Sequence, residues 1–345
     1  MWPANKKIRV MVIDDSMLAR KMIVDGLSRS PRIEVVGTAF NAQDAMSKVA
    51  QLRPDVITSD VEMPGMSGID FLKKLLPRYP LPVILVSSLN LRVFDALSAG
   101  AVDFVRKPEP GKNEEFIKAL TLKVISAAGA KVRRAAQPAG GVLAPQLLGP
   151  RPALDRVIIG LGASTGGTEA TLEVLKRLPK DIPGMLIVQH MPTGFTQMYA
   201  ERLNRLCQME VREAKTGDEV RRGLALLAPA DYQMRVVRNG VRYTVACTQD
   251  PKVSGHRPSV DALFSSMADQ VRCRMVGIIM TGMGRDGAEG LLQMRKNGAY
   301  TIGQDKESSV VYGMPMVAQN IGAVQIQASC ENIAGVLLRQ LNSIQ

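Results

Sequence analysis

Residues 157–168 read VIIGLGASTGGT, an apolar run that ends in a glycine-rich turn around Ser164. The β-branched residues predict a buried strand, and a helical pattern follows the turn. Gly162-x-Ser164-x-Gly166 matches a nucleophile elbow, which exposes a serine hydroxyl between a strand and a helix. A turn with an N-capping serine explains the same residues equally well. A dinucleotide-binding loop fits poorly, because Thr165 stands where the third glycine belongs.

The alternation of strand and helix continues on both sides of this turn, which predicts a second α/β domain. The pattern indicates a doubly wound, Rossmann-like domain with a mostly parallel sheet and a more β-rich middle. Its expected strands are Val157–Leu161, Met185–Gln189, 224–228, 234–247, Met275–Met280 and Tyr300–Gly303, and its expected helices are 168–177, 195–206, 259–268, 286–297 and 331–342.

Two further strand ends carry the partners that a serine nucleophile needs. His190 follows one predicted strand, and Asp286 lies in the turn after another. Because parallel strands end at the same sheet edge, we expect Ser164, His190 and Asp286 to meet there as nucleophile, base and orienting carboxylate. Taken singly, the histidine could simply be packed and the aspartate could be a turn residue. The chain order Ser, His, Asp excludes a standard α/β-hydrolase.

Residues 8–127 show five repeats of strand and helix, which predicts a separate parallel sheet. Its expected strands are Ile8–Ile13, Glu34–Thr38, Val56–Ser59, Val83–Ser87 and Val102–Val105. Carboxylates and hydroxyls follow these strands, and such residues are often only helix N-caps. Several at successive strand ends favour a binding site, because clustered carboxylates repel one another unless Mg²⁺ joins them.

The 345 residues suffice for two domains. We expect the first domain over 6–127, a Pro- and Gly-rich linker over 128–153 and the second domain over 154–345. No signal peptide or membrane-length apolar run is recognisable, so we expect a cytoplasmic chain without membrane insertion. The four cysteines form no CxxC pair, which argues against structural zinc. The net charge of +12 fits acidic protein partners as well as nucleic acid.

Three motifs of the first domain resemble the receiver domain of two-component response regulators: VIDDS at 12–16, SDVEMPGMSG at 59–68 and VRKP at 105–108. The resemblance implies a flavodoxin-like (βα)5 fold in which Asp60 accepts a phosphoryl group from a sensor histidine kinase. It also implies a set of Mg²⁺ ligands and switch residues. The ligands are Asp14, Asp15, Asp60 and the main-chain carbonyl of Glu62, and the switch residues are Ser87, Phe104 and Lys107.

Motifs of the second domain resemble the chemotaxis protein-glutamate methylesterases. They are GASTGG at 162–167, QHMP at 189–192, HRPSVD at 256–261, MTGMGRDG at 280–287 and GMP at 313–315. The resemblance implies hydrolysis of glutamate methyl esters, and deamidation of glutamines, on methyl-accepting chemoreceptors. It implies the Ser164, His190 and Asp286 triad without a cofactor, and the main chain of Met283 is a candidate oxyanion donor.

Two stretches depart from that family's usual pattern. Ala228-Pro229 is followed by ADYQ at 230–233, where the family often has Gly-Gly and a histidine, and Met316 replaces a usual basic residue. Neither departure involves the triad, so both leave the chemistry intact and the exact target open.

The resemblance also implies that the unphosphorylated receiver covers the hydrolase cleft until Asp60 is phosphorylated. Three alternatives remain open. The same hydrolase could serve a receptor-like protein outside chemotaxis, or the chain could be a phosphorylation-dependent scaffold. A DNA-binding response regulator is the main rival from another class, but its output would be a compact helical module rather than about 190 α/β residues. We therefore expect no nucleic-acid partner.

Overall fold

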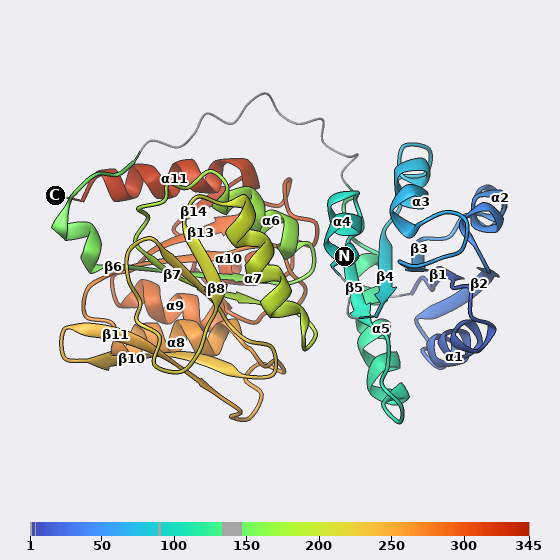
Figure 1. The fold of residues 1–345 in the computed structure, drawn as a ribbon, viewed down its shortest axis with the longest axis horizontal. Helices are drawn as coiled ribbons and strands as arrows, with labels where there is room; N and C mark the ends of the chain where they lie inside the picture. Colours follow the sequence, from blue (N-terminus) through green and yellow to red (C-terminus); the bar gives the residue numbers. More distant parts are fainter. Residues whose placement is uncertain (1, 4, 89–90, 133–146, 345) are drawn as a thin grey trace. The chain divides into compact units, whose positions relative to one another are not determined.

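The computed structural model describes all residues except 1, 4, 89–90, 133–146 and 345. The chain divides into two compact units, residues 1–138 and 139–345 (Figure 1). Much of the predicted linker over 128–153 lies outside the described residues.

The first unit is built on a five-stranded parallel sheet in the order β2-β1-β3-β4-β5. This is the flavodoxin-like order, so the predicted α/β fold is confirmed. The strands are β1 (Ile8–Ile13), β2 (Ile33–Ala39), β3 (Val56–Asp60), β4 (Val83–Ser87) and β5 (Asp103–Arg106), and the helices are α1 (Met17–Ser28), α2 (Ala42–Leu52), α3 (Gly68–Leu75), α4 (Arg92–Ser98) and α5 (Asn113–Ala127).

The second unit contains a seven-stranded sheet in the order β14-β13-β12-β6-β7-β9-β8, and every pairing in it is parallel. The β-rich middle is an antiparallel hairpin of β10 and β11 beside that sheet. The strands are β6 (Val157–Ala163), β7 (Gly184–Gln189), β8 (Glu210–Glu213), β9 (Leu224–Leu227), β10 (Gln233–Asn239), β11 (Arg242–Thr248), β12 (Arg274–Ile279), β13 (Tyr300–Gln304) and β14 (Ile326–Ala328).

Helices of the second unit form two groups on opposite faces of its sheet, as a doubly wound fold requires (Figure 1). One group contains α6 (Gly167–Leu175), α7 (Phe195–Leu206) and α11 (Cys330–Asn342), and the other contains α8 (Val260–Gln270), α9 (Ala288–Lys296) and α10 (Met314–Asn320). A short 3₁₀ helix, η1 (Pro152–Arg156), leads into β6.

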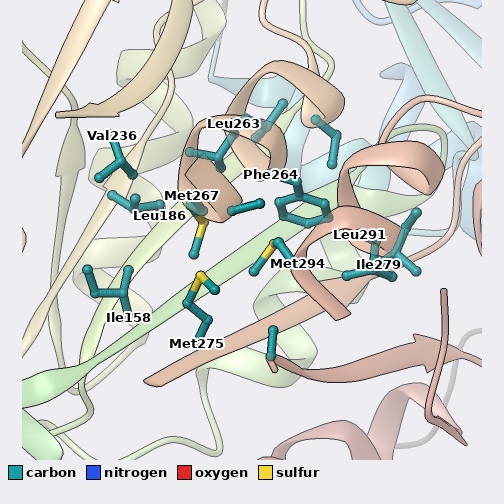
Figure 2. Close-up of a cluster of buried hydrophobic side chains, with 14 of the residues drawn as sticks. Ile158, Leu186, Val236, Leu263, Phe264, Met267, Met275, Ile279, Leu291 and Met294 are labelled. Atoms are coloured by element: carbon teal, nitrogen blue, oxygen red, sulfur yellow. The ribbon is translucent and has the colours of Figure 1, made fainter. Parts of the chain in front are cut away.

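The core between the sheet and the second helix group is closely packed. Phe264 and Met267 of α8 meet Leu291 and Met294 of α9 over the strands (Figure 2). Gly160 in β6 allows this approach, since a Cβ there would lie 2.7 Å from the sulfur of Met267. The packing holds α8 against β6 and so fixes where the N-terminus of that helix lies.

Most predicted elements match the structure within a few residues, but β8, β14, α10 and the short 3₁₀ helix η1 were not predicted. Strands β8 and β14 are short edge strands, and α10 begins at a Met-Pro pair with little helical periodicity. Within the part of the chain that the structure describes, no helix combines the length and apolar character needed to cross a membrane.

Candidate active site

Strand register places Ser164 beside His190. Ala163 in β6 pairs with Gln189 in β7, so the next residue on each strand leaves the sheet at the same edge. The His190 N–H donates to the Ala163 carbonyl at 3.1 Å. The Ser164 N–H donates to the Thr281 carbonyl at 2.9 Å, which ties the turn around the serine to the loop after β12.

Asp286 lies in that same loop and contacts His190. The imidazole Nε2 is 2.8 Å from Asp286 Oδ2. Three further donors come from the N-terminus of α8: the Ser259 hydroxyl at 2.7 Å, and the N–H groups of Val260 and Asp261 at 2.8 and 3.0 Å. The carboxylate is therefore buried but fully hydrogen-bonded.

These contacts keep Asp286 ionised. Burial by itself raises the pKa of this carboxyl. The hydrogen bond and electrostatic attraction of His190, together with the hydrogen bonds from Ser259 and the Asp261 N–H, outweigh burial, and the pKa lies below the ordinary 3.8. A negative charge beside His190 stabilises a protonated imidazole, which is what a general base becomes after it takes a proton.

The remaining nitrogen of His190, Nδ1, has no hydrogen-bond partner among the described residues. The His190 side chain is only 9% exposed. Likewise, the Ser164 hydroxyl donates to and accepts from none of the described groups. Strand register thus places Ser164 beside His190, but no hydrogen bond joins their side chains among the described residues. Nδ1 is the His190 nitrogen that is available to accept a proton.

A second imidazole lies against the first. The rings of His190 and His256 stack with centroids 4.0 Å apart and planes 6° apart. The His256 Nδ1–H donates to the Ser254 carbonyl at 2.8 Å, and this nitrogen is 3.9 Å from Asp286 Oδ2. The nitrogens nearest to Asp286 thus both make hydrogen bonds, and ligand atoms of His190, His256 and Asp286 lie within 4.8 Å of one another. Sequence reasoning gave His256 no role.

Ser259 was also missed as a site residue. Its signal was present, because Ser-Val-Asp before an apolar run is the pattern of a helix N-terminus. The Ser259 hydroxyl caps α8 by accepting from the Ala262 N–H, and it donates to Asp286.

Met283 lies in the turn after β12 and is 40% exposed. Its main-chain N–H has no acceptor among the described residues. A free N–H near the serine can donate to a negatively charged oxygen, so Met283 remains a candidate for that role.

A second cluster lies at the carboxyl edge of the first unit's sheet. Carboxylate oxygens of Asp14, Asp15 and Asp60 lie within 4.8 Å of one another. The Lys107 ammonium is 2.5 Å from Asp60 Oδ2 and 3.6 Å from Asp14 Oδ2. Burial raises the pKa of Asp14 above 3.8, and more strongly than Lys107 lowers it. Asp14 Oδ2 has no hydrogen-bond partner among the described groups, which fits a ligand atom reserved for a cation.

Of the other predicted switch residues, Ser87 is hydrogen-bonded to the main chain of Lys107, and Phe104 lies in the neighbouring strand β5. The Ser87 hydroxyl donates to the Ser88 carbonyl at 2.9 Å, and the Ser87 carbonyl accepts from the Lys107 N–H. Phe104 is buried and packs edge-on against Phe94, with centroids 6.4 Å apart. The Glu62 N–H donates to Asp60 Oδ1 at 3.1 Å, which puts the Glu62 main chain beside the predicted phosphoacceptor.

Comparison with known families covers both units. Residues 159–337 match the CheB methylesterase model, and residues 10–121 match the response regulator receiver domain. The chain belongs to the CheB methylesterase family.

Relatives in this family match almost the whole chain. A protein-glutamate methylesterase/protein-glutamine glutaminase of Syntrophomonas wolfei is 49% identical over 98% of this chain and 99% of its own length. One from Syntrophotalea carbinolica is 47% identical over 95% and 96%. The crystallised methylesterase catalytic domain of Thermotoga maritima CheB is 32% identical, with a TM-score of 0.52, covering 53% of this chain and 97% of that one.

One departure from the methylesterase pattern lies close to the triad. Gln233 is fully buried, and its amide nitrogen donates to the carbonyls of His256 and Pro251 at 3.0 and 3.2 Å. Its oxygen accepts from the Ser259 N–H at 2.9 Å. Among the described residues, no hydrogen bond joins Gln233 to Ser164, His190 or Asp286, but Gln233 holds the segment that carries both His256 and Ser259.

Proposed function

We propose that the chain is a phosphorylation-activated serine hydrolase that removes methyl esters from glutamates, and deamidates glutamines, of chemoreceptors. One observation carries the chemistry: Ser164, His190 and Asp286 gather at one sheet edge, with His190 Nε2 2.8 Å from Asp286. The methylesterase family supplies the substrate class. The phosphodonor is a sensor histidine kinase, and the chain works in the cytoplasm, where such kinases and receptor signalling regions meet.

In the first step, the Ser164 hydroxyl attacks the ester carbonyl and its proton passes to His190 Nδ1. Asp286 accepts from Nε2 and stabilises the imidazolium that forms. When the tetrahedral intermediate collapses, the imidazolium gives its proton to the leaving methoxide, and methanol departs. Water then attacks the glutamyl ester of Ser164 by the reverse proton path, which releases a free glutamate and the serine hydroxyl.

The negative oxygen of the tetrahedral intermediate needs donors that are already in place. The unoccupied N–H of Met283 meets this requirement, because the loop after β12 is tied to the Ser164 main chain. Fixed main-chain donors of this kind stabilise the transition state without reorganising. Deamidation follows the same path, with ammonia leaving in place of methanol.

Control of the hydrolase by phosphorylation is assigned to the cluster of Asp14, Asp15 and Asp60 in the first unit. Asp60 attacks the incoming phosphoryl group, and Asp14, Asp15, Asp60 and the Glu62 carbonyl would hold Mg²⁺. Mg²⁺ supplies positive charge that offsets the carboxylates and the phosphoryl oxygens. Lys107 lies where it can pair with a phosphorylated Asp60, since its ammonium already contacts that side chain. Ser87 and Phe104 are the residues that would respond to the new charge.

Methanol release from methylated receptor membranes, with and without a phosphodonor, tests the proposal. Ser164→Ala should lose activity by orders of magnitude, because the nucleophile is removed. Asp60→Asn should keep its basal rate and lose the response to the phosphodonor. Wild-type methanol release by Ser164→Ala would overturn the serine mechanism, and an unchanged response in Asp60→Asn would overturn the assigned control.

A second candidate is the same chemistry on a receptor-like protein outside chemotaxis. The observation in its favour is the departure at Gln233 beside the site. It predicts that Ser164 reacts with a serine-directed covalent probe while methylated chemoreceptor membranes release no methanol.

A further inference from the structure

A cavity of about 960 Å³ opens at the amino ends of β6, β7 and β12. Its lining includes Val157 and Ile158 of β6, Gly184 of β7 and Arg274 of β12. The residues proposed for ester hydrolysis follow the carboxyl ends of the same strands. A strand of six residues is about 20 Å long, so the cavity and the hydrolytic site lie at opposite edges of the sheet.

Positive charge dominates this cavity, which we call the arginine cavity. It is lined by seven arginines and two acidic residues: Arg156, Arg221, Arg222, Arg238, Arg242, Arg272 and Arg274, with Asp155 and Glu219. The chain already neutralises some of them, since Arg221 pairs with Glu210 and Arg222 with Asp181. Arg156, Arg238 and Arg274 have no carboxylate partner among the described residues. The cavity therefore presents uncompensated guanidinium groups.

The type of basic residue in the cavity indicates which class of ligand it can bind. Every basic residue of the lining is arginine and none is lysine. A guanidinium is planar and binds a carboxylate or phosphate through two parallel hydrogen bonds, so the cavity suits oxyanions. Its charge favours a ligand with several negative groups.

The distribution of the arginines favours a ligand whose carboxylates are spread along a chain, and it disfavours one compact phosphate. They come from separate segments, namely η1, the stretch before β9, both strands of the β10–β11 hairpin, and the start of β12. No α-helix begins among the lining residues, whereas phosphate sites concentrate donors at helix N-termini. The hairpin turn adds Val241, which is 93% exposed, beside the half-buried Tyr243. Arginine next to tyrosine and apolar surface is typical of protein interfaces.

We propose that the arginine cavity is a docking site for an acidic peptide segment of a partner protein. Carboxylates of the segment pair with Arg156, Arg238 and Arg274, and its apolar atoms contact Val241 and Tyr243. The site is separate from Ser164, so a partner can hold the enzyme there without occupying the hydrolytic edge. The proposal is about binding and stands whether or not the esterase substrate is correctly assigned.

Fluorescence anisotropy of a labelled glutamate-rich peptide with the full-length chain tests this at physiological salt. Arg156→Gln, Arg238→Gln and Arg274→Gln together should weaken binding by at least about tenfold, even though exposed ion pairs are individually weak. The matched control combines Arg205→Gln, Lys252→Gln and Lys296→Gln, which remove the same charge from exposed positions outside the cavity. The control should bind like the wild type.

Three results would overturn the proposal. The first is an equal loss of peptide binding in both triple variants, and the second is no peptide binding by the wild type. The third is that ATP or anionic lipid vesicles bind in preference to the peptide and that this binding depends on the cavity arginines. Thermal unfolding and methanol release should match the wild type in both variants, because none of the six residues lies in the hydrolytic machinery. These two measurements distinguish a variant that has lost peptide binding from one that no longer folds.

Discussion

The carboxylate of Asp286 accepts from four groups that reach it from two directions. His190 comes from the end of β7, and the other three donors come from the start of α8. Free N–H groups at a helix N-terminus carry partial positive charge, so they suit a buried anion. The helix thereby performs two tasks: it packs on the sheet, and it holds the carboxylate that we propose as the acid of the triad.

Ser259→Ala should lower kcat for methyl ester hydrolysis by about 10- to 100-fold, because Asp286 loses one charge-assisted hydrogen bond. KM should change little, since Ser259 orients Asp286 and has no assigned contact with substrate. Kinetics on methylated receptor membranes, with Ser259→Thr as the variant that keeps the hydroxyl, measure this. Equal losses in the alanine and threonine variants would contradict the role of the hydroxyl.

The pH dependence of stability follows from the same contact. The folded pKa of Asp286 lies below 3.8, so its ionised form stabilises the fold above that pH. This contribution disappears as the pH falls through the lowered pKa. Removing the Ser259 donor brings the pKa back up, and the acid unfolding midpoint of Ser259→Ala should therefore move to higher pH.

Asp14→Asn should stabilise the first unit and abolish its function. The change removes a buried charge whose Oδ2 has no hydrogen-bond partner among the described residues. Without divalent cations, thermal unfolding of the first unit should occur a few degrees higher than in the wild type. The phosphodonor should no longer raise esterase activity. A lower unfolding temperature would show that Asp14 is already well compensated by Lys107.

At the scale of elements, the loop after β12 approaches the Ser164 turn so closely that only glycine fits. A Cβ at Gly282 would lie 2.7 Å from Ser164 Cβ and 2.3 Å from the Met314 sulfur. The loop and the turn must therefore stay in contact for the serine to keep its position.

Gly282→Ala should push the Ser164 turn out of place and reduce kcat at least about tenfold, since small misplacements of reacting groups are costly. Gly335→Ala in α11 is the matched control, because a Cβ there has no neighbour nearer than 3.6 Å. That variant should keep full activity and gain slightly in stability. Similar kinetics in both variants would mean that the loop adapts.

The sequence correctly predicted the elements that contain long apolar runs and missed those that do not. Strands β6, β7 and β12 bury nearly every residue, and a β-branched pattern marks such strands clearly. The edge strands β8 and β14 have four and three residues, too few to establish a period.

The residues of the candidate site likewise fall into those that the sequence predicts and those that it does not. Strand ends identify Ser164, His190 and Asp286, because all parallel strands finish at one edge. Ser259 reaches the site from the start of α8, His256 from the loop before it and Gln233 from the start of β10, and their approach depends on how α8 packs. Sequence alone does not give that packing.

At the scale of the whole molecule, the two units each have their own sheet and core. If phosphorylation of Asp60 relieves an inhibition, removing residues 1–130 should raise basal methanol release several-fold and make it independent of a phosphodonor. The second unit should fold alone, because it has its own sheet and core. Equal basal rates with and without residues 1–130 would contradict inhibition by the first unit.

Strand β6 lies between β7 and β12, and all seven of its residues are buried. Opening its backbone to solvent requires breaking hydrogen bonds on both sides, whereas β8 and β14 each have one neighbour. Fraying of a parallel sheet therefore begins at its edges and reaches the middle last. Because Ser164 directly follows β6, the proposed nucleophile should be attached to the slowest-exchanging strand of its sheet, and fraying of the edge strands β8 and β14 should leave its alignment undisturbed.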